Sequence, residues 1–203
     1  HTIALGDYGK TVSPSRLADI FLELQKKGAA NINLVTPTHY IPQIRDALLL
    51  AKDKGLHLPI VYNTGSYESV DSLRLLDGHI DIYLPDLKYF SAELSSMYSH
   101  ANDYFATAAS AITEMYRQVG TPVFHENTGL MKRGMIVRHL VLPGQTKDSK
   151  KVLRFLRETY GNKIYIGIFF RGFANKFSLT AADFKTKLVA FSFITENFRH
   201  IKD

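Results

Sequence analysis

The sequence contains no cysteine and no tryptophan among its 203 residues. The absence of cysteine excludes disulfide bonds, thiol nucleophiles and structural zinc sites of the cysteine type. No apolar run approaches the ~20 residues that a membrane-spanning helix needs, and residues 1–5 lack the basic region of a signal peptide. The absence of cysteine also fits a cytoplasmic protein, and we expect that location. The chain lacks an initiator methionine, so we expect it to be a piece of a longer protein.

Charge is unevenly distributed within a net charge of +6. Residues 1–130 carry 10 Lys or Arg against 14 Asp or Glu, whereas residues 131–203 carry 15 against 5. A nucleic-acid-binding protein would use such a basic half as its electrostatic footprint. Because no RNA- or DNA-binding motif accompanies the charge, we interpret it as a solvated basic face and expect no nucleic-acid partner.

Short β-branched runs alternate with longer helical patterns. We expect strands at 31–35, 58–62, 80–84, 135–142 and 163–169. We expect helices at 14–27, 42–54, 69–76, 91–119 (broken near 100–103), 149–160 and 180–194. Residues 121–133, rich in turn-forming types, are expected to form a loop. This alternation predicts an α/β fold with a parallel sheet, arranged either as an open sheet or as a partial barrel.

Polar side chains cluster at the predicted strand ends, where parallel α/β folds place their sites. In chain order they are Thr36, Thr38, His39, Asn63, Thr64, Asp86, Lys88, Arg138 and His139. The set indicates a site for a polar, charged ligand. Asp86 and Lys88, two residues apart, would point to the same side of an extended segment, either toward a ligand or into a local ion pair.

Five ordered blocks resemble radical S-adenosylmethionine (SAM) proteins related to the pyruvate formate-lyase activating enzymes. They read GAANINLVTPTH (28–39), PIVYNT (59–64), DIYLPDLKY (81–89), EMYRQVG (114–120) and RGMIVRHLVLPG (133–144). The resemblance covers roughly residues 10–168. It implies that residues 1–168 are a truncated core domain, a partial (β/α) barrel with five of its six strands present and with the first strand and the cluster loop absent.

The resemblance also implies a chemistry. Three cysteines of a CxxxCxxC loop would hold a [4Fe–4S] cluster, and SAM would bind the fourth iron. Reductive cleavage would give a 5′-deoxyadenosyl radical that abstracts hydrogen, in activating enzymes from a glycine of a partner protein. The implied partners are thus a glycyl-radical-type protein and an electron donor such as flavodoxin or ferredoxin, with no membrane partner.

The chain departs from this pattern because cluster iron needs thiolates and the sequence has none. We therefore expect truncation just after the cluster loop, with natural loss of the cluster as the alternative. The fragment itself is expected to be inactive, with no catalytic residue, no metal and no bound cofactor. Loss of the first strand would expose the edge of the next one, which predicts self-association along that edge.

The resemblance assigns SAM contacts residue by residue. Asn33, Thr36 and Thr38 stand where the second strand of the family meets the methionine amino group. Asn63 and Thr64 stand near the polar end of the ligand. Asp86 and Lys88 match residues that help to hold the ligand, and Arg138 would face the methionine carboxylate. We expect His139 to be packed on the other face and His39 to be solvated.

Residues 169–203 hold 8 of the 13 phenylalanines, and the resemblance fades there. We expect a divergent Phe-rich tail packed on the same domain as a final helix. Its N-cap would be Thr180, with Asp183 in the first turn and Phe184, Leu188 and Phe191 on the buried face. An exposed tail would instead form a partner surface or promote aggregation.

Two other functions remain open from the residues alone. Lys88 could form a Schiff base in a lyase, although Asp86 beside it would keep the lysine charged. The chain could also be a binding module without chemistry, which holds an adenosyl ligand or uses its basic half to bind an acidic partner.

Overall fold

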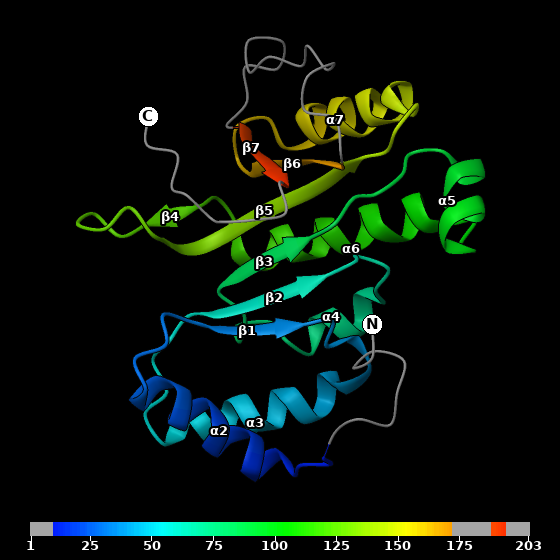
Figure 1. Cartoon of the computed structure of the whole chain (residues 1–203). Coiled ribbons are helices and arrows are strands. Elements are labelled where there is room, and N and C mark those ends of the chain that lie inside the picture. The colour runs from blue at the N-terminus through cyan, green and yellow to red at the C-terminus, as the bar shows by residue number, and fades with distance from the viewer. Residues whose placement is uncertain (1–9, 172–187, 194–203) are drawn as a thin grey trace.

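The computed structural model describes residues 10–171 and 188–193 (Figure 1). The strands are β1 (Ile32–Val35), β2 (Ile60–Thr64), β3 (Ile82–Pro85), β4 (Val123–Phe124), β5 (Met131–Val141), β6 (Tyr165–Arg171) and β7 (Leu188–Phe193). They form one sheet in the order β1-β2-β3-β5-β6-β7, all parallel, with β4 antiparallel to β5. Within the described residues β1 and β7 do not pair with each other, so the sheet is open.

The α-helices follow the expected alternation with the strands. They are α2 (Pro14–Lys26), α3 (Ile41–Asp53), α4 (Val70–Arg74), α5 (Ala92–Ser99), α6 (Tyr104–Val119) and α7 (Thr146–Tyr160), and a 3₁₀ turn, η1, spans Thr38–Tyr40. The predicted cap of α2 is confirmed, because the Ser13 hydroxyl accepts the Arg16 N–H at 3.2 Å. The predicted break between α5 and α6 is also confirmed, with the left-handed residue His100 ending α5.

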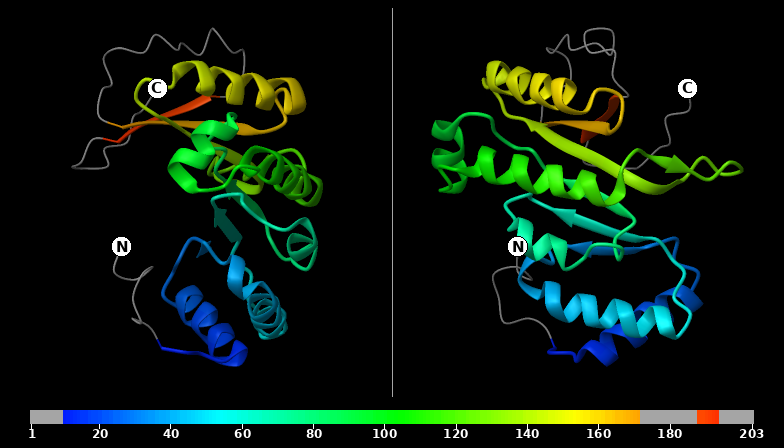
Figure 2. Two further views of the ribbon diagram at one scale, coloured as in Figure 1. Left: turned by 90° about the vertical axis from the view of Figure 1, so that its right-hand side faces the viewer. Right: turned by 180° about the vertical axis from the view of Figure 1, so that it is seen from behind.

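The two faces of the sheet differ in what covers them. One face, here called the covered face, packs against the helices, which lie on one side of the sheet (Figure 2). Its side chains are almost fully buried, and they include Ile32, Tyr62, Tyr83, Met135, Val137, Ile166 and Ile168. The other face, here called the open face, carries partly exposed side chains. These include Asn33, Val35, Asn63, Leu84, Asp86, Arg138 and Leu140.

Two sequence-based expectations are wrong. Residues 188–193 form strand β7, paired in parallel with β6, where we expected helix; the rest of the predicted 180–194 helix lies outside the described residues. A spacing of three and four between Leu188 and its aromatic neighbours matched a helix, but a short apolar run can equally form a buried strand. Residues 121–133 also form more than a loop, since β4 and the start of β5 make a hairpin.

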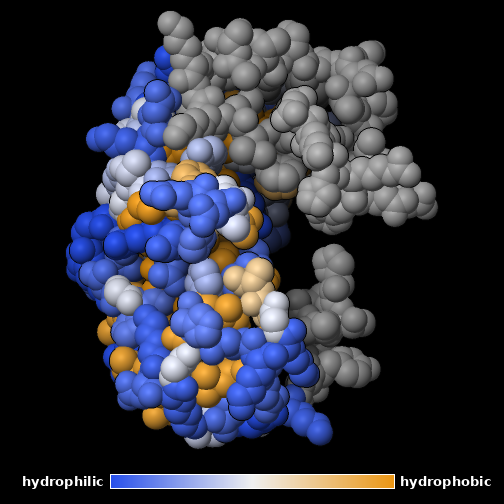
Figure 3. Space-filling view, turned by 90° about the vertical axis from the view of Figure 1, so that its left-hand side faces the viewer, coloured by the Kyte–Doolittle hydropathy of each residue, from blue (hydrophilic) through white to orange (hydrophobic). Residues whose placement is uncertain are grey.

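Gly134 fixes the base of this hairpin. Its φ of +140° disfavours other residues, and a Cβ there would lie 2.8 Å from the Cα of Pro122. The hairpin projects from the end of the sheet where the parallel strands begin, and that end is mostly hydrophilic with small separate apolar patches (Figures 1 and 3). Among the described residues, no helix is long and apolar enough to cross a membrane.

Candidate functional site

Three side chains from three strands meet on the open face. The guanidinium of Arg138 on β5 donates from Nε to Asp86 Oδ1 and from Nη2 to Asn63 Oδ1, each at 2.7 Å. Asp86 follows β3, and Asn63 lies in β2. The Arg138 and Asp86 side chains are each 26% exposed, so this charged pair is neither dry nor freely solvated. Nη1 has no hydrogen-bond partner in the described structure and can take a further acceptor.

The backbone holds this group in register. Asp86 and Arg138 form a parallel β-bridge, in which the Leu87 N–H donates to the Arg138 carbonyl at 2.9 Å. The Asp86 N–H donates to the Thr64 carbonyl, also at 2.9 Å. Strand pairing thus continues past the end of β3, which keeps the carboxylate beside the guanidinium. The site is therefore largely preformed by the sheet itself.

Tyr104, at the start of α6, ties the neighbouring loops together. Its buried hydroxyl lies 3.0 Å from the carbonyl oxygens of Gly65 and of Asp86, and it accepts the Lys88 N–H at 3.1 Å. Burial raises the pKa of this hydroxyl, so it stays protonated at neutral pH and can donate to these carbonyls. These contacts of Tyr104 were difficult to predict from the sequence, because Tyr104 lies 16 residues or more from the groups that it contacts.

Burial also governs the electrostatics of Asp86. It raises the pKa of the carboxyl group, while the positive charges of Arg138 and Lys88 act in the opposite direction. The possible ion pair between Asp86 and Lys88 does not form; the ion-pair partner of Asp86 is Arg138. The pairing is set by the cross-strand bridge rather than by proximity in sequence.

A pocket of about 280 Å³ adjoins these charges. Its polar lining comes from Asp86, Lys88 and Arg138, and its apolar lining comes from Tyr89, Leu140, Leu142 and Phe169. The Lys88 ammonium forms no hydrogen bond or ion pair in the described structure, and it would lie 3.5 Å from a Cβ placed on Gly65. The pocket thus offers both charges and an apolar wall to a ligand that carries both characters.

Two of the predicted site residues belong to a different, buried cluster. Thr38 and Thr64 donate their hydroxyls to Oε1 of Glu68, and the Tyr62 hydroxyl donates to the same oxygen at 3.2 Å. Glu68 is only 3% exposed. The carboxylate was missed from the sequence because it follows β2 by four residues, in a segment where an acidic residue is usually exposed, and one of its partners, Thr38, lies 30 residues away.

This Glu68 cluster has unsatisfied groups and strained neighbours. Within the described part of the chain, Oε2 of Glu68 and the Ser66 hydroxyl are both buried without a hydrogen-bond partner. Thr36 and Ser66, which follow β1 and β2, adopt left-handed φ values of 51° and 67°. Such a conformation is uncommon for residues other than glycine, and it is found at sites where the surroundings enforce it.

The remaining predicted residues are not brought into either group by side-chain contacts. Asn33 lies exposed on the open face, and Thr36 takes part through its N–H, which donates to the Asn63 carbonyl at 2.8 Å. His39 is exposed, as expected. His139 is 1% exposed, which confirms the expectation that it packs on the covered face. Its Nδ1 lies 2.7 Å from the Leu87 carbonyl oxygen.

Among the described residues, no group of three or more His, Cys, Asp or Glu side chains could hold a metal ion. The open face presents one guanidinium, one carboxylate, one amide and one ammonium beside an apolar wall.

The sequence matches no protein-family model. It is 26% identical over 156 residues to an uncharacterized protein of Methanocaldococcus jannaschii, an alignment that covers 75% of this chain and 40% of that protein. The chain thus spans less than half the length of the curated relative that it matches. A solved domain of a pyruvate-formate lyase-activating enzyme from Bacteroides vulgatus superposes with a TM-score of 0.56 at 12% identity, covering 80% of this chain and 99% of that domain. The chain therefore shares an α/β fold with that activating-enzyme domain.

Proposed function

We propose that this chain is the SAM-binding part of a radical SAM domain, a partial (β/α) barrel whose open face receives the ligand. The observation that supports this most is the linkage of Asn63, Arg138 and Asp86 across three strands, beside a pocket with an apolar wall. The similarity in fold to an activating-enzyme domain agrees with the proposal. The whole protein would then resemble the pyruvate formate-lyase activating enzymes.

The residues on the open face suit SAM. Arg138 has an Nη1 without a partner among the described residues, and Asn63 has an amide, so these two would bind the methionine carboxylate. The Asp86 carboxylate would accept from the amino group. The apolar wall, Leu140, Leu142 and Phe169, would contact the adenosine. When bound beside a reduced iron–sulfur cluster, SAM supplies hydrogen-abstraction chemistry.

The residues of this chain do not suit the cluster itself. Cluster iron needs thiolates, and the chain has no cysteine. We therefore derive no catalytic step for the chain, and its own contribution is to bind and orient SAM. We propose that the cysteines lie in a segment of the protein preceding His1. Reading the coding DNA upstream of His1 tests this: a CxxxCxxC loop within a few codons supports it, and an open reading frame without cysteines contradicts it.

The binding part of the proposal can be tested with the chain as it exists. We expect SAM to bind saturably in isothermal titration calorimetry, and we expect Arg138→Lys to weaken binding by about tenfold or more, because a lysine cannot reproduce the guanidinium fork. Arg154→Lys, at an exposed position of α7, is the matched control and should change the dissociation constant by less than about twofold. Absence of saturable binding, or equal effects of both variants, would refute it.

One observation favours a second function. Lys88 lines the pocket and forms no ion pair with the described residues, as a lysine that forms a Schiff base would. Borohydride trapping with a panel of 2-keto acids and aldehydes distinguishes the two. Covalent labelling of the wild type that is absent in Lys88→Ala would favour the lyase, whereas SAM binding without labelling would favour the radical SAM assignment.

A further inference from the structure

A second hollow, distinct from the pocket on the open face, lies between α5 and the start of α7. It has a volume of about 260 Å³. Leu94 and Met97 of α5 form its apolar side, and Gln145, Lys147 and Lys151 form its polar side. Met97 is 60% exposed, so its flexible thioether faces solvent rather than the core. We call this hollow the α5–α7 groove.

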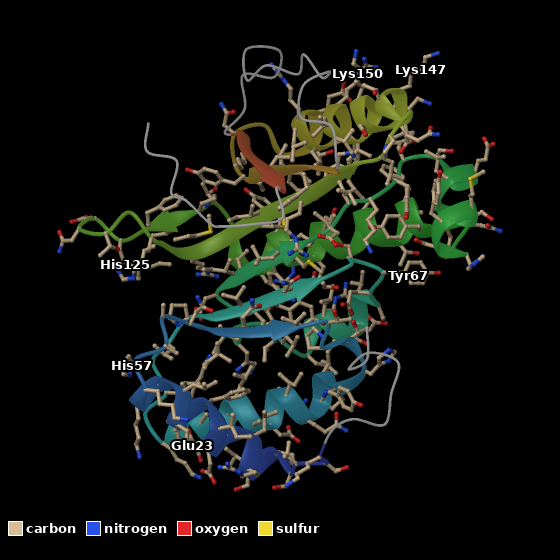
Figure 4. All side chains as sticks on the ribbon, in the orientation of Figure 1. Glu23, His57, Tyr67, His125, Lys147 and Lys150 are labelled. Atoms are coloured by element: carbon tan, nitrogen blue, oxygen red, sulfur yellow. The ribbon has the colours of Figure 1, made fainter. Side chains whose placement is uncertain are left out.

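A stripe of positive charge continues from the groove along α7. Lys147, Lys150 and Arg154 are all exposed and recur at a spacing of three or four residues, so they lie along one side of the helix. Figure 4 shows Lys147 and Lys150 on the outer side of α7. The opposite side of α7 is buried through Val152, Leu153, Leu156 and Tyr160. We call Lys147, Lys150 and Arg154 the α7 stripe.

Among the described residues, Lys147, Lys150 and Arg154 form no ion pair. Asp148 is buried, and its two carboxylate oxygens accept the N–H groups of Phe90 and Ser91. Glu93 at the groove and Glu158 at the end of α7 are the acidic residues left exposed on these two helices. The Lys151 ammonium lies 5.7 Å from the centre of the Phe90 ring, which holds this fourth cation at the groove. The surface thus keeps a clear excess of positive charge.

The α5–α7 groove lies close to the pocket on the open face. Leu142, which follows β5, lines that pocket, and Gln145, three residues later, lines the groove. A molecule seated in the groove would therefore stand beside the mouth of the ligand site. This placement makes the surface more than a solvated helix face, because what docks there can reach or shield a bound ligand.

We propose that the α5–α7 groove and the α7 stripe bind an acidic surface of a partner protein, which inserts an apolar side chain against Met97. Exposed methionine at the centre with charged residues around it is typical of protein interfaces. The stripe runs from Lys147 to Arg154, a rise of about 10 Å along the helix, which fits within one face of a small protein. Glu93 at the rim disfavours a phosphate backbone, and this favours a protein partner over a nucleic acid.

The proposal is independent of the identity of the ligand on the open face. It is tested by fluorescence anisotropy with three probes of equal negative charge: an acidic amphipathic peptide with two leucines, a polyglutamate peptide and an oligouridine. We expect the amphipathic peptide to bind best, and we expect its affinity to fall at higher salt. Tighter binding of the oligouridine than of either peptide would overturn the proposal in favour of a nucleic-acid surface.

Two matched sets of variants locate the site. The variant K147E/K150E/R154E should weaken binding of the amphipathic peptide by about tenfold or more. The control K10E/K26E/K27E changes the net charge equally at exposed positions before, in and just after α2, and it should weaken binding by less than about threefold. Equal losses of affinity in the two triple variants would show an effect of net charge alone and would refute the proposed site.

The apolar part of the site has its own variant. Met97→Asp should weaken binding of the amphipathic peptide by about tenfold and change the affinity for polyglutamate by less than about twofold. Only the amphipathic peptide inserts a leucine side chain. An unchanged affinity for the amphipathic peptide would contradict the groove. Circular dichroism checks folding of each variant, and K147A/K150A replaces the triple variant if its helical signal falls. SAM titration of the same variants separates this proposal from the previous one, since we expect no change there.

Discussion

The covered and open faces of the sheet are made by alternate residues of the same strands, yet the covered face contributes to stability and the open face carries the candidate ligand site. Tyr83 and Met135 on the covered face are fully buried, whereas Asp86 and Arg138, close by on the open face, keep a quarter of their side-chain surface in water. Apolar burial contributes most of the free energy of folding, and partly solvated charges contribute little. The comparison teaches that stability and ligand binding can be altered separately in this fold.

The largest expected effect is on the covered face. Met135→Ala should lower the free energy of unfolding by about 2–5 kcal/mol, because a fully buried side chain leaves a cavity. Leu140→Ala, on the same strand but 39% exposed on the open face, should cost less than about 1 kcal/mol. Urea unfolding followed by circular dichroism measures both. Similar losses of unfolding free energy at the two positions would contradict the difference between the covered and open faces.

The Glu68 cluster is the polar exception near the covered face. Glu68→Ala should lower the free energy of unfolding by about 2–3 kcal/mol, since the buried hydroxyls of Tyr62 and Thr64 lose their acceptor. Glu68→Gln keeps an acceptor oxygen and should cost about 1 kcal/mol or less. Urea unfolding again provides the measurement. A glutamine variant as unstable as the alanine variant would show that the charge, and not the acceptor, matters.

A pH dependence should come from His139. Burial lowers the pKa of its imidazole in the folded state below the ordinary value of 6.5, so the unfolded chain takes up a proton first. Stability should therefore be complete above about pH 6.5 and fall at lower pH, with a slope of up to about 1.4 kcal/mol per pH unit. Urea unfolding between pH 7 and pH 5 measures this slope.

His139→Asn, which keeps a donor toward the Leu87 carbonyl, should reduce the slope. His79, whose pKa burial also lowers, contributes in the same direction and leaves part of the slope in place. The control is His57→Asn, at the exposed surface shown in Figure 4. The same slope in the His139 variant as in the wild type would contradict the assignment.

The smallest effect on stability concerns the edge of the open face at β1. Val35 is 65% exposed, and β1 pairs only with β2 in the described structure. Val35→Lys should change the free energy of unfolding by less than about 0.5 kcal/mol but reduce self-association, because a charge at a strand edge disfavours pairing with another chain. Light scattering at high concentration measures this. The control is Leu75→Lys, which is 42% exposed and follows α4.

Much of the fold could be predicted because its signals are local. The cap at Ser13 and the break near His100 were read from the sequence, and each predicted strand overlaps an observed one. The prediction of a helix at residues 188–193 was wrong because a six-residue apolar run fits either a strand or a helix, and pairing with β6 decides between them. Such pairing is a contact between distant residues, which spacing along the chain does not contain.

The candidate site could be predicted only in part. The rule that ligands bind at the ends of parallel strands pointed to Asn63, Asp86 and Arg138, and the structure joins all three. The rule could not assign Thr38 and Thr64 to the cluster around Glu68, because the contact between Thr38 and that carboxylate joins residues 30 positions apart. That these residues bind SAM stays a prediction.

The order of strands has a consequence for how the molecule folds. Because the parallel strands lie side by side in the order of the chain, each can add to its predecessor as the polypeptide leaves the ribosome. The longest segment between two neighbouring parallel strands runs from β3 to β5, and it contains α5, α6 and the hairpin. Asn63 and Asp86 would be in place early, while their guanidinium partner arrives with β5. Pulsed hydrogen exchange would show this as late protection at Arg138, so that the ability to hold a ligand emerges only after half of the sheet already exists.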